Sequence, residues 1–470
     1  MKACTMEIKT ITLHHEIIKN DMKKLIILSL SALAATVQAQ TVWTAQRCMQ
    51  YAVEHNTQVR RAALELDNYE ASRLGAVGNF LPSVNAGIGA QYNFGRAIDP
   101  ETNGYTDVST FYNDYSVYAS LPVFDGFSRV NALKAAKASV LMGRNALREQ
   151  QDQTAIATLQ AWVNALYYEG TVAMAEEKQR ETDLLLRQTQ VLVEVGRKSA
   201  ADLAQIEAQQ AEAAYELTRQ ENLRASAMLD LKRQMSMPLD TIVSIFVPMP
   251  GTSGANAWNQ QCQSLEPTVP MPGTSGANGW HPALQQQYHT MQARLYEWRQ
   301  ARAALLPALS LSAGLNTTYF KTLHSQTATS FSDQFKNNMG EYIGATLSIP
   351  LFNRLQTVTS IRRAKNNYRI AREAYEDKQQ ELQKLSREAW QDWQAYLKQT
   401  EQMTHKVEAD SLAYQLTRRQ FEEGLSTAID LHTTSAQLLQ SKATLLQCQL
   451  MAMVKHELVR YYNGETIWTE

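Results

Sequence analysis

The chain has 470 residues, with 45 Lys and Arg against 46 Asp and Glu, and 44% of its residues are hydrophobic. A net charge of -1 without a long basic run gives little electrostatic reason to bind nucleic acid, whose phosphates attract clustered Lys and Arg. The hydrophobic fraction is ordinary for a globular chain and excludes general disorder.

The N-terminal region has the pattern of a secretory signal peptide. A charged start at Met22 is followed by a 13-residue apolar run, Leu25 to Val37, and by a small-residue cleavage signal that ends at Ala39. The run is too short for a transmembrane helix, which takes about 20 apolar residues. We therefore expect residues 1–39 to be an upstream extension plus signal peptide, with the start at Met22 and cleavage after Ala39.

Export would place the cysteines in an oxidising compartment. The predicted mature chain has three of them, Cys48, Cys262 and Cys448. An odd number cannot be fully paired within one chain, and the spacings match no metal motif. A Cys48–Cys448 disulfide stays open, and we expect no metal site.

The chain repeats itself at a spacing of 228 residues. Leu121 to Phe124 recurs as Ile349 to Phe352, and Glu194-Val195-Gly196 recurs as Glu422-Glu423-Gly424. Two copies of one unit are therefore predicted, at 40–239 and 281–465. The segment 240–280 between them is rich in Pro, Gly, Ser and Asn, which indicates a linker.

Each copy contains two short segments in which apolar and polar residues alternate. They predict strands at about 82–96, 112–123, 308–320 and 341–350. Segments of about 10 residues with aromatic ends are typical of transmembrane β-strands, although soluble half-buried hairpins give the same pattern. Single-chain barrels begin at about eight strands, so four cannot close. If the strands cross a membrane, several chains must share one barrel; otherwise two hairpins cap a helical protein.

Two long helices follow the strands in each copy, at about 128–195 and 199–236, and at about 353–423 and 427–462. A helix of the length from Ser128 to Val195 extends about 100 Å. A heptad series typical of a coiled coil runs through the last helix, at Leu431, Leu438, Leu445, Ala452 and Val459.

Both helical hairpins turn in the same way. Gly196 and Gly424 can take the left-handed conformation that ends a helix. Ser199 and Thr427 then cap the next helix. Asp202 and Asp430, three positions later, complete a capping box with Asp in place of Glu.

These elements, in this order and twice over, resemble the TolC-like outer membrane efflux proteins, the outer membrane factors. The likeness includes Leu81-Pro82 and Leu306-Pro307 before the strand pairs, and covers nearly all of 40–465. It implies an α+β membrane protein with two tandem repeats, each of helix, β-hairpin and long helical hairpin. It also implies a homotrimer that forms a shared 12-stranded β-barrel, four strands per chain, and a periplasmic α-helical barrel.

The resemblance implies a function as well. The protein would be the outer membrane channel of a tripartite efflux or type I secretion system, a passive exit duct with its helical part in the periplasm. An inner-membrane pump would deliver solutes to it through a periplasmic adaptor (membrane fusion) protein.

The resemblance also implies site residues. Asp202 and Asp430 match the pore constriction, and a ring of such carboxylates attracts cations; helix capping alone is the alternative role. The tips would contact the adaptor through Gly196, Arg197, Ser199, Leu203, Gly424, Ser426, Thr427 and Leu431. The chain departs from the family at Thr433, where some members have a further acidic residue, so the closing contacts do not transfer directly.

Two other classes compete with the channel. A soluble periplasmic coiled-coil adaptor or spacer would also have repeats and heptads. An enzyme is not expected, because the sequence has no HExxH, GxSxG or phosphate-loop motif. We therefore expect no catalytic residues and no cofactor.

Overall fold

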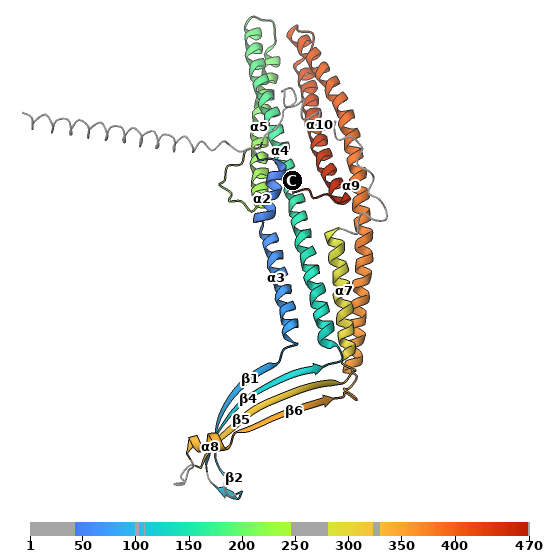
Figure 1. The fold of residues 1–470 in the computed structure, drawn as a ribbon. Coiled ribbons are helices and arrows are strands. Elements are labelled where there is room, and N and C mark those ends of the chain that lie inside the picture. Colours follow the sequence, from blue (N-terminus) through green and yellow to red (C-terminus); the bar gives the residue numbers. More distant parts are fainter. Residues whose placement is uncertain (1–42, 99–102, 108, 246–280, 323–329, 469–470) are drawn as a thin grey trace, which may run out of the picture.

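The computed structural model describes residues 43–98, 103–107, 109–245, 281–322 and 330–468. The molecule is elongated, with long helices that extend from one end of a β-sheet (Figure 1). The predicted signal peptide and most of the predicted linker lie outside the described residues. Within the described ranges, none of the helices combines the length and apolar character that a membrane crossing requires.

The main sheet has four antiparallel strands drawn from both halves of the chain. They are β1 (Ser83–Asn93), β4 (Thr110–Phe124), β5 (Ala308–Thr322) and β6 (Gly340–Ser348), in the order β1-β4-β5-β6. The first hairpin therefore joins the second through the β4–β5 pair. Strands β1 and β6 form the two outer edges of this sheet, and neither edge has a partner strand among the described residues.

The register separates the two faces of the sheet by polarity. Ala86 pairs with Val117, and Val117 pairs with Leu315, so apolar side chains line up across three strands. The next residues along the strands, such as Ser116 opposite Asn316, point to the other face. The apolar face is exposed in the single chain: Ile343 on β6 is 89% exposed. A continuous apolar face of this kind needs a cover that one chain does not provide.

Short elements occupy the connections at the far end of the sheet. They are a ribbon of β2 (Arg96–Ile98) and β3 (Tyr105–Asp107), and the helix α8 (Phe331–Asn337). Gln334 of α8 bonds through its side-chain amide to both the backbone N–H and the carbonyl of Phe320, each at 2.8 Å. The amide thus satisfies backbone hydrogen-bonding groups of β5 where this strand extends past its pairing with β6.

Four helices meet the other end of the sheet: α3 (Thr57–Gly78), α4 (Ser128–Glu194), α7 (Pro282–Ala303) and α9 (Gln356–Glu422). Helices α4 and α9 each have 67 residues and begin 228 positions apart, as the sequence repeat does. Each follows two residues with positive φ, Gly126 and Phe127 or Arg354 and Leu355. A Cβ at Gly126 would lie 2.7 Å from the Ala303 carbonyl oxygen, so this turn accepts only glycine.

The largest core lies partway along the helices, away from the sheet. It is formed by α2 (Ala45–His55), the middle of α4 and the ends of α5 (Ala200–Gln234) and α10 (Ala428–Asn463). The Trp162 indole donates to the Trp43 carbonyl at 2.9 Å and anchors the N-terminal segment there. Both halves of the chain therefore share one core.

Two cysteines lie in the described chain and both are free. Cys48 and Cys448 are buried, so the Cys48–Cys448 disulfide left open by the sequence is not formed. Burial raises the pKa of the Cys48 thiol to about 12. The thiol is therefore neutral and serves as a small apolar core group. Cys262 lies outside the described residues.

Candidate functional site

The two helical hairpins end in the same backbone turn, at the end of the molecule opposite the sheet (Figure 1). Gly196 and Gly424 have φ of 73° and 80°. The N–H of Arg197 donates to the Leu192 carbonyl at 2.7 Å, and the N–H of Leu425 to the Gln420 carbonyl at 2.8 Å. This is the Schellman arrangement, in which a left-handed residue satisfies the last carbonyls of a helix.

A reciprocal capping box starts each return helix. The Ser199 hydroxyl accepts the Asp202 N–H at 3.1 Å, and the Asp202 carboxylate accepts the Ser199 N–H at 3.2 Å. Thr427 and Asp430 repeat the arrangement at 3.2 and 3.1 Å. Both carboxylates thus have a structural role at the tips.

The same hydrogen bonds keep these carboxylates charged. Contacts with Ser199 lower the pKa of Asp202, and contacts with Thr427 lower that of Asp430. Asp430 also accepts from the Ser426 hydroxyl at 3.3 Å and is exposed. A charged, exposed carboxylate can therefore cap its helix and still contribute to an electrostatic barrier.

The predicted adaptor-contact residues differ in accessibility. Gly196, Arg197, Ser199, Gly424 and Thr427 are exposed at the tips, whereas Leu203 and Ser426 are half-buried. Leu431 is only 3% exposed and packs with Ile206 and Phe421 between the hairpins. Its side chain supports the tips from inside. The accessible apolar side chains at the tips are instead Val195, Leu425 and Ile429.

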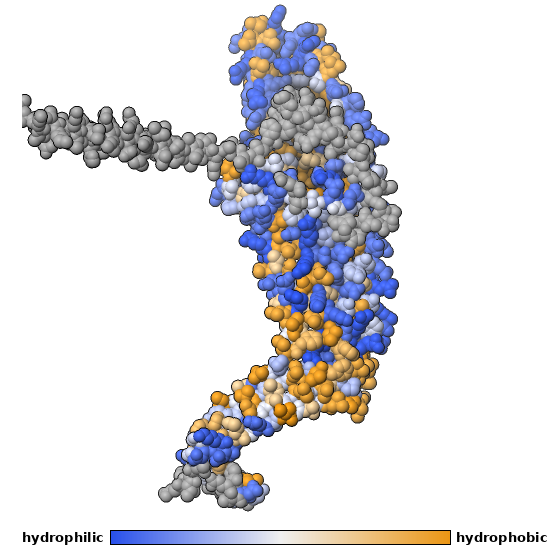
Figure 2. All heavy atoms as spheres, in the orientation of Figure 1, coloured by the Kyte–Doolittle hydropathy of each residue, from blue (hydrophilic) through white to orange (hydrophobic). Residues whose placement is uncertain are grey.

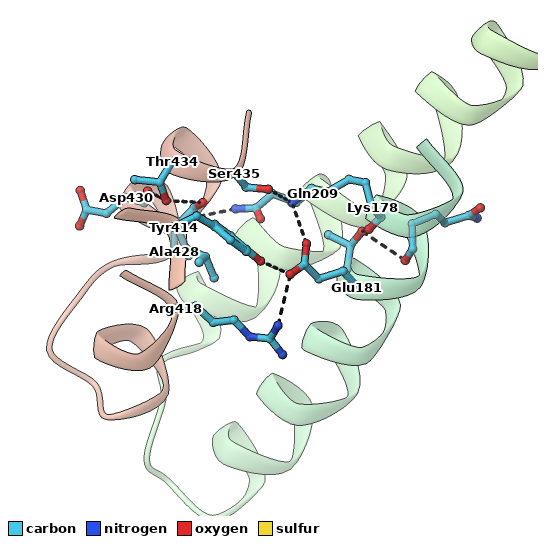
Figure 3. A network of polar contacts seen from close by, with 12 residues as sticks. Lys178, Glu181, Gln209, Tyr414, Arg418, Ala428, Asp430, Thr434 and Ser435 are labelled. Carbon is cyan, nitrogen blue, oxygen red and sulfur yellow. Dashed lines mark hydrogen bonds and ion pairs between the residues drawn. The ribbon is translucent and has the colours of Figure 1, made fainter. Parts of the chain in front are cut away.

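A polar cluster ties the two hairpins together near the tips (Figure 3). The Glu181 carboxylate on α4 accepts a hydrogen bond from the Tyr414 hydroxyl on α9. The same oxygen lies 3.4 Å from the Arg418 guanidinium, also on α9. Burial, followed by the contact with Glu181, raises the pKa of Tyr414, so the phenol remains a donor. We call Glu181, Tyr414 and Arg418 the hairpin lock.

Further bonds continue the connection to the second return helix. The Lys178 ammonium donates to the Ser435 hydroxyl on α10, and lies 3.9 Å from Glu181. Gln209 on α5 donates to the Ala428 carbonyl at 3.1 Å (Figure 3). Burial lowers the pKa of Lys178. Polar side chains thus join all four long helices close to their tips.

The sequence interpretation did not identify the hairpin lock. Glu181 is 233 residues from Tyr414 and 237 from Arg418, and no local motif connects them. A comparison of the two copies could have found it. At the position equivalent to Glu181 the second copy has Ala409, and at the positions equivalent to Tyr414 and Arg418 the first copy has Leu186 and Gln190. The two copies therefore differ in polarity where they face each other.

Other kinds of site are not apparent in the described part of the chain. No group of three or more His, Cys, Asp or Glu side chains is placed to hold a metal ion there. The arrangement at the tips holds two helical hairpins together through bonds that can break, and it presents two charged carboxylates. Such contacts suit a part of the molecule that moves, and they do not resemble a catalytic site.

Comparison with known proteins identifies relatives across most of the chain. The model of the outer membrane efflux protein family matches residues 48–235 and 275–453. The alkaline protease secretion protein AprF of Pseudomonas aeruginosa is 20% identical over 386 residues, which are 79% of this chain and 75% of AprF. The outer membrane efflux protein BepC of Brucella suis is 22% identical over 362 residues, 77% of this chain and 73% of BepC.

The fold has solved counterparts as well. The CmeC outer membrane channel of Campylobacter jejuni matches with a TM-score of 0.76 at 14% identity, over 90% of this chain and 87% of CmeC. The expected fold class, with its four strands and long helical hairpins, is confirmed by this likeness and by the sheet order.

Proposed function

Because the chain belongs to the outer membrane efflux protein family, and is an outer membrane efflux or secretion channel, we propose that three copies assemble into one exit duct. Each copy contributes four strands to a shared 12-stranded barrel in the outer membrane. The long helices form a tunnel that extends into the periplasm. The family is one of channels and not of enzymes, and its match favours this function over a soluble adaptor or spacer.

The observation that carries the assembly is the open sheet. β1 and β6 have no partner strands among the described residues, and the apolar face is exposed. Unpaired backbone groups in hydrocarbon cost several kcal/mol each, so a sheet that spans lipid must close. Pairing β6 of one copy with β1 of the next supplies the missing bonds at every edge. The exposed apolar face then contacts lipid.

The hairpin lock supports a gate at the periplasmic end. It connects the first hairpin to the second within one chain, so the tunnel entrance cannot widen until Glu181 separates from Tyr414 and Arg418. Asp202 and Asp430 stand at the same end, and in a trimer they would form rings that favour cations. Opening then requires a partner that binds the separated hairpins better than the locked ones.

The partners follow from the geometry of the tips. A periplasmic adaptor would dock on the exposed tip residues, among them Arg197, Leu425 and Ile429, and a pump in the inner membrane would deliver the solute. The relatives are named for protease secretion and for efflux, so the duct serves either protein secretion or solute efflux.

Single-channel recording in planar bilayers tests the gate. Tyr414→Phe combined with Arg418→Leu removes both contacts between Glu181 and α9. A hydrogen bond to a charged group contributes about 1.5–3 kcal/mol. We therefore expect the ratio of open to closed channels to rise at least about tenfold.

Arg419→Leu is the matched control, because Arg419 is an exposed neighbour on the same helix. It should leave the recordings unchanged. Equal opening in the lock variant and the control would contradict the gate. In the same recordings, Asp202→Ala with Asp430→Ala should reduce cation preference if the carboxylates line the pore; an unchanged preference leaves them as caps.

A further inference from the structure

The helix ends that meet the sheet are free of acidic residues. The segments 71–78, 126–148, 298–303 and 356–372 contain no Asp or Glu, although the whole chain is almost neutral. Ten exposed cations occupy these segments on α4, α7 and α9. Arg144 and Arg372 pair with Glu70 and Glu376. Six of the others form what we call the basic collar: Lys134, Arg299, Arg302, Arg362, Lys365 and Arg369. Charge is therefore segregated along the molecule, with the positive zone next to the sheet.

The cations of the basic collar lack acidic partners. Within the described ranges, none of them forms an ion pair, whereas Lys378, Lys384 and Lys406 farther along α9 all do, at 2.8, 3.4 and 2.6 Å. Aromatic rings accompany them instead: Arg302 and Lys365 lie 5.9 and 5.8 Å from the Trp298 ring centroid. Positive charge without internal compensation is available to an external anion.

The collar continues an exposed apolar band. Leu351, Phe352 and Leu355, between β6 and the start of α9, are 93%, 78% and 61% exposed. Figure 2 shows hydrophobic residues gathered where the helices meet the sheet, and hydrophilic ones farther along the helices. The change from apolar to basic occurs over a short distance.

One face of α9 contains residues of both the apolar band and the basic collar. Positions 355, 358, 362, 365 and 369 alternate in steps of three and four, which places them on one face of the helix. The first two are Leu and Val, and the next three are Arg, Lys and Arg. At 1.5 Å per residue, Arg362 lies about 10 Å beyond Leu355 along the axis.

We propose that the basic collar binds the anionic phosphate headgroups of phospholipids in the periplasmic leaflet of the outer membrane. The proposal rests on the membrane placement of the sheet in the proposed function. A headgroup layer is about 5–8 Å thick on each side of the hydrocarbon core. Lys and Arg side chains extend toward such a layer while their stems cover apolar surface, and Trp298 has the aromatic character typical of the interface.

An anionic solute in the duct is the competing occupant. This face of α9 favours lipid, because it also presents Leu355 and Val358, each more than half exposed, and lipid covers apolar side chains better than water does. Arg362 and Lys365 lie one and two turns beyond Val358, which matches the order of hydrocarbon and headgroup in a leaflet, and Arg369 lies one turn farther along the same face.

The test uses the full-length channel reconstituted in phosphatidylcholine vesicles. Trace spin-labelled phosphatidylglycerol or spin-labelled phosphatidylcholine reports, by electron paramagnetic resonance, the fraction of lipid held at the protein surface. Each cation near the surface strengthens the binding of an anionic lipid by about 1 kcal/mol, which is about fivefold in the equilibrium constant. We expect a clear preference for phosphatidylglycerol at low salt, reduced at least about fivefold by Arg362→Gln, Lys365→Gln and Arg369→Gln together.

The matched control carries Lys384→Gln, Arg387→Gln and Lys398→Gln, the same loss of charge on exposed residues farther along α9. It should keep the preference. No preference in the unmodified channel, or an equal loss in the control, overturns the proposal. So does an unchanged lipid preference with altered ion selectivity, which would place the collar in the duct. Conductance of the same vesicles separates the two claims, because a preparation that does not conduct contradicts the proposed function itself.

Discussion

Asp202 and Asp430 occupy the third position of the two return helices and accept the backbone N–H of the cap residue at 3.2 and 3.1 Å. The pKa of each carboxyl lies below its usual range because these bonds favour the charged form. A group with a lowered folded pKa stabilises the fold above its unfolded pKa of about 3.9, and that contribution is lost as pH falls through the folded pKa. The tips should therefore loosen in acid.

Hydrogen exchange at residues 196–203 and 424–431 measures this effect. Protection of both tips should be constant from neutral pH to about pH 5 and should fall below about pH 4. Asp202→Asn with Asp430→Asn should remove that fall, because the amide does not titrate. A fall of equal size in this variant would show that other groups control the tips.

The cap hydroxyls offer a second residue-scale prediction. Ser199→Ala and Thr427→Ala each remove the acceptor for the N–H at the third helical position, which costs about 1 kcal/mol of local stability. Exchange at each tip should rise about fivefold in its own variant, with the other tip as internal control. Unchanged exchange at the substituted tip would contradict the capping role.

At the scale of elements, the strands depend on which face each residue occupies. Ile343 and Thr346 lie on the same strand, β6, and an odd separation places them on opposite faces. The register aligns Ile343 with the apolar side chains of its neighbours, and Thr346 with Ser310. One face must therefore contact lipid and the other must face the barrel interior.

A lysine scan of one strand tests this assignment. Ile343→Lys places a charge on the lipid face, which costs about 2–4 kcal/mol near the midplane of the bilayer. We expect a lower urea midpoint for the channel in vesicles, and less protein in the outer membrane fraction. Thr346→Lys is the matched control and should insert normally. If both substitutions have the same effect, the two faces are assigned wrongly.

The elements were predictable where the sequence is periodic. Alternation identified the four strands, and the absence of Pro and near absence of Gly indicated the long helices. The small ribbon β2–β3 and helix α8 are too short to show a period, so the sequence suggested only connections there. Asn56 separates α2 from α3, and its side chain caps α3 through the Gln58 N–H at 2.7 Å.

The site was less predictable than the fold. The glycine turns and capping residues of the tips are local in sequence, and they were found by comparing the two copies. Leu431 was expected to contact an adaptor, but its own heptad position directs it into the core between the hairpins. Glu181 and Tyr414 meet only through tertiary packing, which no local pattern in a single sequence encodes.

At the scale of the whole molecule, the sheet of the described chain has four strands and two free edges. One such sheet cannot close, and the exposed apolar face cannot remain in water. The helices continue from the strands at the end of the sheet, so an assembly that closes the sheet also brings the helices of several chains together. A shared barrel satisfies the edges, the apolar face and the continuity of strands into helices together.

The mass of the assembly tests this central claim most directly. The protein is extracted from isolated outer membranes in mild detergent, and its mass is measured by light scattering with the detergent contribution subtracted. We expect a membrane-borne particle of three mature chains. A monomer recovered from the soluble periplasmic fraction would contradict both the shared barrel and the exit duct.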